Sequence, residues 1–299
     1  MTYSIVARDP GTGELGAAVQ SHWFSVGPIV PWAQPGVGAV ATQANVDPAY
    51  GPRLLDLLAA GIDAPSALER LVAADAGAHG RQVAVVDAAG RVAVHTGEEC
   101  MPYAGHVTGA GVSCQANIMA TPTVWGAMLD AFASAAGERL QARLLAALDA
   151  GEAAGGDIRG RQSAAILVVP ADGEAWESSV SLRVEDDPEP LDELRRLMVL
   201  HDAYALAGPA DALVNERNYD GAAKLYREAA ALAPSSVELR FWAGLGMAQL
   251  GELDAGIAEV RGVIAESPGW GELIARLPDE VLPSISAVRA GLGIAARRD

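Results

Sequence analysis

The chain of 299 residues is long enough for one large domain or two ordinary ones, and 51% of its residues are hydrophobic, so it can bury a sizeable core. Its 38 acidic residues exceed its 21 Lys and Arg residues, and the net charge of -17 without a basic cluster argues against binding to nucleic acid or to an anionic membrane. Two cysteines outside any C-x-x-C motif, no secretory signal and no long apolar run lead us to expect a cytoplasmic protein without a membrane span.

The first predicted element is a β-hairpin. Tyr3–Ala7 and Leu15–Val19 are apolar, β-prone runs, and the sequence DPGTG at residues 9–13 between them has the composition of a turn. The stretch GTGELG also matches G-x-G-x-x-G, which in a dinucleotide site lies between a strand and a helix. No helical cap or periodic run follows the second strand, so we interpret these glycines as turn and close-packing residues.

The remainder of residues 1–184 shows strands alternating with pairs of helices. Helical apolar spacing predicts helices at Pro52–Ala60, Pro65–Ala74, Pro122–Ala136 and Leu140–Ala150. Strands are predicted at Gly36–Ala44, Gln82–Val86, Val92–His95, Gly105–Gln115, Ser163–Val169 and Trp176–Val184, and three prolines interrupt residues 28–35 before the first of these. This segregated order indicates an α+β fold with antiparallel strands, in which two stacked sheets carry helices on their outer faces.

The end of the chain has a different character. Acidic residues and two prolines at residues 185–193 predict a linker, and residues 194–299 predict helices only. Pro234 and Pro268 lie 34 residues apart, as do Tyr219 and Leu253, and this is the period of tetratricopeptide repeats. We therefore predict a helical, tetratricopeptide-like domain, which offers a docking surface for a partner protein or a contact in a homo-oligomer.

Thr2, directly behind Met1, is the candidate nucleophile. Methionine before a small residue is normally removed, and removal would expose a Thr2 α-amine with a pKa of about 7.7 to 8.0. A partly neutral amine can accept the proton of its own hydroxyl, so that nucleophile and base share one residue. Threonine is also a common second residue, and its position alone leaves a purely structural interpretation open.

Three ordered blocks of sequence resemble a bacterial family, the domain-of-unknown-function family numbered 1028. They lie at residues 2–44, at residues 81–97 (RQVAVVDAAGRVAVHTG) and at residues 156–169 (GDIRGRQSAAILVV), and the similarity spans residues 2–184. That family is assigned to the N-terminal-nucleophile hydrolases, alongside proteasome β subunits, which share a four-layer αββα sandwich. The resemblance implies an αββα domain at residues 1–184 that hydrolyses an amide or peptide bond of a small molecule or short peptide. Thr2 would be the nucleophile after loss of Met1, and no cofactor would be needed.

The resemblance also implies that polar residues at neighbouring strand ends surround Thr2. Asp157 and Ser163 resemble a pair that supports the terminal threonine of proteasome subunits, with Asp157 stabilising the protonated amine. The residues expected to bind substrate or an oxyanion are Ser21, His22, Gln43, Asn45, Gln115, Asn117, Arg159 and Gln162. Two alternatives stay open: Asp157 and Arg159 form a structural loop pair, and His22 is a structural histidine.

The chain departs from the family pattern at one position, and it has no motif for a metal site or for an α/β-hydrolase triad. Family members usually carry Gly-Asn where this chain has Ala116-Asn117, and a positive φ there would strain the alanine. The five histidines form no close pair or H-E-x-x-H motif, and no G-x-S-x-G elbow is present, so we expect no metal and no α/β-hydrolase triad. The alternative function is a non-catalytic scaffold whose helical repeats dock a partner protein. A β-aminopeptidase-like or acyltransferase activity would differ only in the acceptor.

Overall fold

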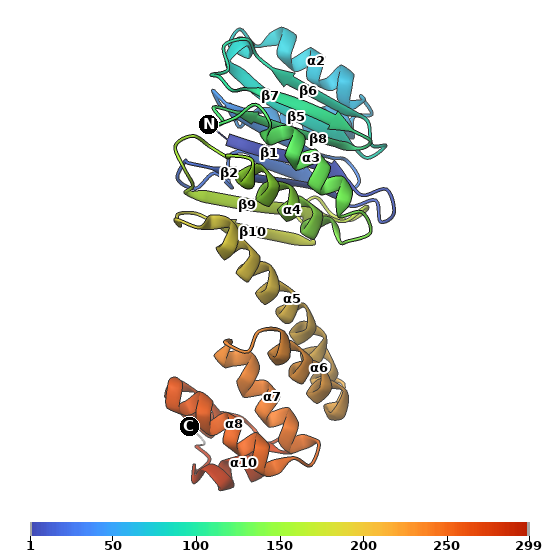
Figure 1. Ribbon diagram of the computed structural model, residues 1–299. Coiled ribbons are helices and arrows are strands. Elements are labelled where there is room, and N and C mark those ends of the chain that lie inside the picture. Colours follow the sequence, from blue (N-terminus) through green and yellow to red (C-terminus); the bar gives the residue numbers. More distant parts are fainter. Residues whose placement is uncertain (1, 298–299) are drawn as a thin grey trace. The chain divides into compact units, whose positions relative to one another are not determined.

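The computed structural model describes residues 2–297, and the chain divides into two compact units, Met1–Arg195 and Arg196–Asp299. The first unit combines two antiparallel sheets with helices, and an all-helical region follows it (Figure 1). The predicted α+β class is therefore confirmed. Helix α5 (Pro190–Asn215) begins within the stretch expected to be a linker and continues into the second unit.

Two antiparallel sheets form the inner layers of the first unit. The larger sheet has the strand order β10-β9-β2-β1-β8-β7, and the smaller one has the order β3-β4-β5-β6. Strand β1 is thus an interior strand, paired with β2 on one side and with β8 on the other. The strands are β1 (Thr2–Arg8), β2 (Leu15–Ser21), β3 (Pro31–Gln34), β4 (Gly38–Ala44), β5 (Arg81–Asp87), β6 (Val92–Thr96), β7 (Gly105–Gly109), β8 (Val112–Asn117), β9 (Ser163–Val169) and β10 (Val180–Val184).

Helices cover the outer face of each sheet. Helices α3 (Val124–Ser134) and α4 (Leu140–Ala153) pack on the larger sheet, as Figure 1 shows. Helices α1 (Tyr50–Ala59) and α2 (Ala64–Ala74) pack on the smaller sheet. Strands β1 and β2 contact β4 across the space between the sheets, which completes four layers in the order helix, sheet, sheet, helix.

The space between the sheets changes from apolar to polar along the strands. Its apolar part includes Val6 and Val19 of the larger sheet and Ala41 and Val86 of the smaller sheet. Toward the start of β1, the inner faces instead carry buried hydroxyl and amide side chains, namely Thr2, Ser4, Ser21, Gln43, Gln82, Gln115, Asn117 and Ser163. Burying polar groups is costly unless they are hydrogen-bonded, so this end of the interior must contain a network.

Two strands differ from the sequence prediction. The single strand predicted over Gly105–Gln115 is wrong, because the chain turns back at Gly111, which has a φ of 70°, and forms the β7–β8 hairpin. The proline-interrupted stretch contains β3, which was not predicted. It lies at a sheet edge and begins with Pro31, a position where a missing N–H removes no ladder hydrogen bond.

The second unit contains two helices of equal length at the predicted spacing. Helices α6 (Tyr219–Leu232) and α8 (Leu253–Glu266) begin 34 residues apart, and α7 (Val237–Gln249) packs against both. Glycines allow the close approach: a Cβ on Gly256 would lie 2.4 Å from the carbonyl oxygen of Gly244. Helices α9 (Gly269–Arg276) and α10 (Ile285–Leu292) follow. Over the described residues, no helix combines the length and apolar character needed to cross a membrane.

The contact of α1 with β3 gives a test of packing. A Cβ on Gly51 would lie 2.3 Å from Cγ of Trp32, so Gly51→Ala should lower the free energy of unfolding by about 1–3 kcal/mol. A Cβ on Gly126 in α3 meets nothing within 4 Å, and Gly126→Ala should raise the same quantity by about 0.5–1 kcal/mol. Urea titration followed by circular dichroism measures both, and equal effects of the two changes would contradict the packing.

Candidate active site

Thr2 begins β1 and lies in a row of four polar residues across the larger sheet. Thr2 is paired with Asn117 of β8 and with Ser21 of β2, and Ser21 is paired in turn with Ser163 of β9. Residues directly opposite one another in an antiparallel ladder point to the same face. The row therefore places four predicted site residues side by side at the polar end of the interior.

Hydrogen bonds hold both the side-chain hydroxyl and the backbone carbonyl of Thr2. Its Oγ1 lies 3.0 Å from Oγ of Ser21, and the Thr2 side chain is buried. The Thr2 carbonyl accepts from Nε2 of Gln43 at 3.3 Å and from Nδ2 of Asn117 at 3.4 Å. These contacts come from three different strands and fix the residue between the two sheets.

Gln82, which the sequence analysis did not identify, is the centre of this network. Its Oε1 accepts from Nε2 of Gln43 at 2.7 Å and from Nδ2 of Asn117 at 3.0 Å. Its Nε2 donates to Oγ1 of Thr96 and to the carbonyls of Gly105 and Ala116. The sequence carries one signal, a glutamine beside the apolar run of the strand RQVAVVD. In the structure this glutamine is buried directly opposite Gln43 and therefore needs hydrogen-bond partners.

Gln115 belongs to the same interior but contacts a different residue of β1. Its Nε2 donates to Oγ of Ser4 at 2.7 Å, and its Oε1 accepts from Oγ of Ser113. Its carbonyl lies 3.4 Å from Nε2 of Gln43. Gln115 thus supports the network around Thr2 through its backbone, and its side chain serves Ser4.

Asp157 and Arg159 form a close ion pair. The Asp157 side chain is fully buried, and its Oδ1 accepts from the backbone N–H and Nε of Arg159 at 2.9 and 3.1 Å. Its Oδ2 accepts from Nη2 of Arg159 at 2.9 Å and from the backbone N–H of His22 at 3.2 Å. This is the geometry of the structural loop pair. The expected contact of Asp157 with a protonated Thr2 α-amine requires the loss of Met1, which lies outside the described residues, and stays a prediction.

The remaining predicted residues hold loops. Oγ of Ser163 donates to the carbonyl of Trp23 at 2.5 Å and accepts from the N–H of Val26 at 3.1 Å, so its hydroxyl fixes the chain after β2. His22 Nδ1 lies 3.3 Å from the carbonyl oxygen of Arg161. Gln162 donates to Asp186 at 3.0 Å.

A cavity of about 220 Å³ reaches Thr2. Its polar lining consists of Thr2, Gln43 and Arg159. Its apolar lining consists of Trp23, Val26, Ile29, Val30, Ala44, Val46 and Met101. Thr2, which lies within the row of the larger sheet, therefore faces a space large enough for part of a small ligand.

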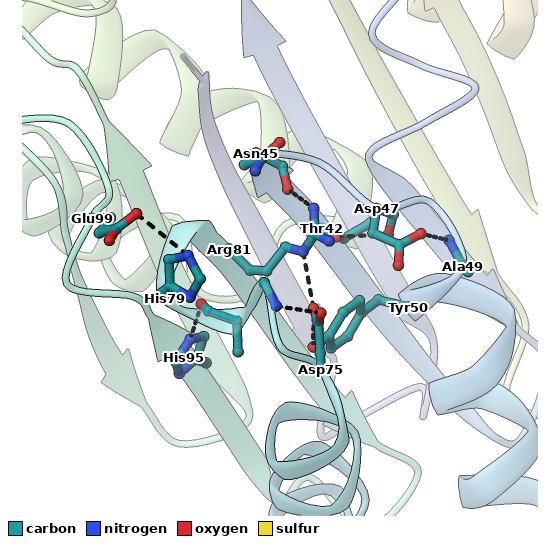
Figure 2. Close-up of polar contacts among 12 residues, drawn as sticks. Thr42, Asn45, Asp47, Ala49, Tyr50, Asp75, His79, Arg81, His95 and Glu99 are labelled. Carbon is teal, nitrogen blue, oxygen red and sulfur yellow. Dashed lines mark hydrogen bonds and ion pairs between the residues drawn. The ribbon is translucent and has the colours of Figure 1, made fainter.

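The Arg81 cluster, formed by Arg81, Asp75 and Tyr50, holds the chain after β4, where it forms part of the cavity wall. Figure 2 shows the contacts of this cluster. Ala44 lines the cavity with a φ of 68°, a left-handed conformation that is strained in alanine. Nη1 of Arg81 donates to the carbonyl of the adjacent Asn45, whose side chain is exposed. Nε of Arg81 donates to Asp75 at 3.0 Å, and the Tyr50 hydroxyl donates to the same carboxylate at 3.1 Å.

The titration of this cluster follows from its contacts. Hydrogen bonds from Arg81 and from the N–H of Gly77 hold the pKa of Asp75 below its ordinary value. Burial, followed by the hydrogen bond to Asp75, raises the pKa of Tyr50 to about 12. The cluster therefore keeps one carboxylate ionised and one phenol neutral near pH 7.

The strain anticipated at Ala116 is absent. Ala116 lies within the extended strand β8, and the left-handed residue nearby is Ile118, with a φ of 56°. Alanine is compatible with an extended backbone, so its replacement of the family's glycine leaves the strand intact. Within residues 2–297, no group of three or more His, Cys, Asp or Glu side chains is arranged to hold a metal ion.

The comparison with known proteins decides the family. A model described as "Family of unknown function (DUF1028)" matches residues 2–194. The chain belongs to the DUF1028 family. This confirms the resemblance inferred from the three sequence blocks, and the match includes every residue of the candidate site.

Solved structures resemble part of this DUF1028 protein. Protein SPO2555 from Silicibacter pomeroyi, a member of the same family, is 34% identical with a TM-score of 0.60, and the match covers 66% of this chain and 87% of that one. Anbu, the ancestral β-subunit from Yersinia bercovieri, is 11% identical with a TM-score of 0.34 over 65% of this chain and 92% of that one, a similarity too low to support an argument. A search of curated proteins found no match.

The amide network gives a test with a matched control. Gln82→Met should lower the free energy of unfolding by about 2 kcal/mol or more, because it removes the acceptor shared by Gln43 and Asn117 and the donor to the carbonyls of Gly105 and Ala116. Gln20→Met should be neutral or stabilising, since neither amide atom of the fully buried Gln20 has a hydrogen-bond partner in the described part of the chain. Amide hydrogen exchange in β1 and β8 measures both, and similar losses of protection would contradict the role of Gln82.

The acid response of the Arg81 cluster gives a second test. A carboxylate whose folded-state pKa is lowered stabilises the fold above its unfolded value of about 3.9, and this contribution is lost as the pH falls through the folded pKa. Asp75→Asn should therefore lower stability at pH 7 and flatten the loss of stability below about pH 4. The exposed Asp130 of α3 provides the control substitution, Asp130→Asn. Unfolding free energies measured from pH 7 to pH 2 that keep the wild-type slope in Asp75→Asn would contradict this assignment.

Proposed function

We propose that this protein is an N-terminal-nucleophile amidohydrolase that acts on a small amide or short peptide. Removal of Met1, which lies outside the described residues, would turn Thr2 into both nucleophile and base. The observation that carries the proposal is that Thr2, held by Ser21, Gln43 and Asn117, lines the 220 Å³ cavity. A fixed nucleophile beside a space that accepts part of a substrate is what acyl transfer requires.

The first half of the reaction forms an acyl-enzyme. Oγ1 of Thr2 attacks the amide carbonyl carbon and passes its proton to the neutral α-amine of the same residue. The tetrahedral intermediate then collapses, the C–N bond breaks, and the protonated α-amine returns the proton to the leaving nitrogen. The products of this half are a free amine and an ester on Thr2.

The second half releases the acid. The neutral α-amine accepts a proton from water, the resulting hydroxide attacks the ester carbonyl, and the C–O bond to Thr2 breaks as the proton returns to Oγ1. Ser21, whose hydroxyl lies 3.0 Å from Oγ1, orients the nucleophile in both halves. Among the described residues that line the cavity, Arg159 alone carries a formal charge, and its ion pair with Asp157 compensates that charge.

Substitution of Thr2 tests the proposal. Processed protein with a Thr2 N-terminus, verified by intact mass, should hydrolyse members of a library of aminoacyl and dipeptide anilides. Thr2→Ala should lower kcat/KM by about 10³-fold or more because it removes the nucleophile, whereas Thr2→Ser should retain measurable activity. Thr12→Ala changes an exposed threonine of the β1–β2 turn and should leave activity unchanged.

The pH profile provides the control on mechanism. Because the base is an α-amine, kcat/KM should rise through an apparent pKa of about 7.7 to 8.0. Full activity in protein that retains Met1, or in Thr2→Ala, would overturn the proposal.

A further inference from the structure

The floor of the cavity beside Thr2 is an extension of the apolar core. Val26 and Val30 line the cavity, are 1% and 2% exposed, and belong to the cluster that fills the space between the sheets. Ile29, a third lining residue, packs against the same cluster. A ligand group that enters the cavity therefore meets the hydrocarbon side chains that form the protein's interior.

This floor is fixed by hydrogen bonds within the protein. The N–H groups of Ile29 and Val30 both lie 3.2 Å from the carbonyl oxygen of Val26, which closes a tight turn. Ser163 bonds both Trp23 and Val26, so the segment is tied to β9 at its start. A pocket whose walls are already ordered loses little conformational entropy when a ligand binds, which favours binding.

The mouth of the cavity carries large apolar side chains that face solvent. Trp23 and Met101 line the cavity, yet they are 59% and 58% exposed. Phe24 and Tyr103, close to them in the sequence, are also exposed. Exposed apolar side chains gathered at one opening are typical of a site that binds an apolar ligand group.

The charge balance of the lining disfavours a charged ligand group. The guanidinium of Arg159 is paired with Asp157 through two hydrogen bonds of 2.9 and 3.1 Å, so its charge is largely compensated. The other lining residues are neutral. An ionised side chain that entered this cavity would lose its hydration without gaining an equivalent partner.

We propose that this cavity binds the side chain of the substrate's acyl residue, and that this residue carries one large apolar side chain such as Leu, Met or Phe. The proposal rests on the function proposed for Thr2, because the scissile carbonyl must lie at Oγ1 while the side chain fills the cavity. A dry cavity of about 150 Å³ holds benzene, so 220 Å³ accepts a phenyl or isobutyl group.

A panel of aminoacyl anilides that differ only in the acyl side chain tests the specificity. Leu and Phe substrates should have a kcat/KM about tenfold or more above that of the Ala substrate, because each buried methylene adds to transition-state binding. Glu and Lys substrates should fall below Ala. Hydrolysis that favours Ala, Glu or Lys would overturn this inference and leave the function proposed for Thr2 in place.

Two substitutions locate the preference in the cavity. Val46→Trp fills the space from a half-buried wall position and should reduce the Leu-to-Ala ratio about tenfold. Met101→Glu, at an exposed position where folding is not at risk, should reduce the ratio by placing a charge at the mouth. Trp176→Ala removes an aromatic that is 80% exposed, in the β9–β10 loop, and should leave the ratio unchanged. A ratio unchanged in both cavity variants would overturn the assignment.

Binding to the Thr2→Ala variant separates the two proposals. N-acetyl-leucine amide should bind more tightly than N-acetyl-glutamate amide in isothermal titration, and adding Val46→Trp should abolish the difference. If the processed protein hydrolyses no amide yet shows this binding preference, the hydrolase proposal fails and the pocket assignment stands. If the leucine amide does not bind in preference, the pocket assignment fails whether or not hydrolysis is seen.

Discussion

Gln82 joins the two sheets at the end of the interior where Thr2 lies. Its amide is bonded to Gln43 within the smaller sheet and to Asn117 and two backbone carbonyls of the larger one. Because a buried amide that loses its hydrogen bonds costs free energy, this sharing fixes how the sheets meet. Gln43 and Asn117 also bond the Thr2 carbonyl. The position of Thr2, and with it that of its hydroxyl, therefore depends on the hydrogen bonds that Gln82 makes to these two residues.

Two loops give the cavity its shape, and each is held from a distant part of the chain. Ser163 of β9 holds the loop after β2, and Arg81 of β5 holds the loop after β4. Loops are usually the mobile part of a fold. Here the restraints keep Ala44 in a left-handed conformation, and strain of this kind persists only where the surroundings impose it. The conformation of the cavity wall therefore depends on contacts from distant strands as well as on the sequence of the loops.

Local pattern in the sequence was sufficient for the fold class and for part of the candidate site. Alternating apolar runs and turn residues predicted the hairpin of β1 and β2. The family resemblance singled out Ser21 and Asn117 near Thr2, and strand pairing places these three residues side by side. The roles of Gln82 and Arg81 could not be predicted, because their partners come from strands and loops far apart in the chain. The partners of Ser163 were missed for the same reason, since a strand-end serine carries no sign of which loop it will bond.

The groups that bond Thr2 in the described structure are a hydroxyl and two carboxamides, all of them electrically neutral. Such contacts do not gain or lose charge between mildly acidic and mildly alkaline solution. These contacts of the Thr2 hydroxyl and carbonyl are therefore independent of proton concentration, whereas the neighbouring wall depends on the ionised Asp75. On acidification the lining beside Ala44 would loosen before the threonine itself, so ligand recognition would be lost ahead of the anchoring of the reactive residue.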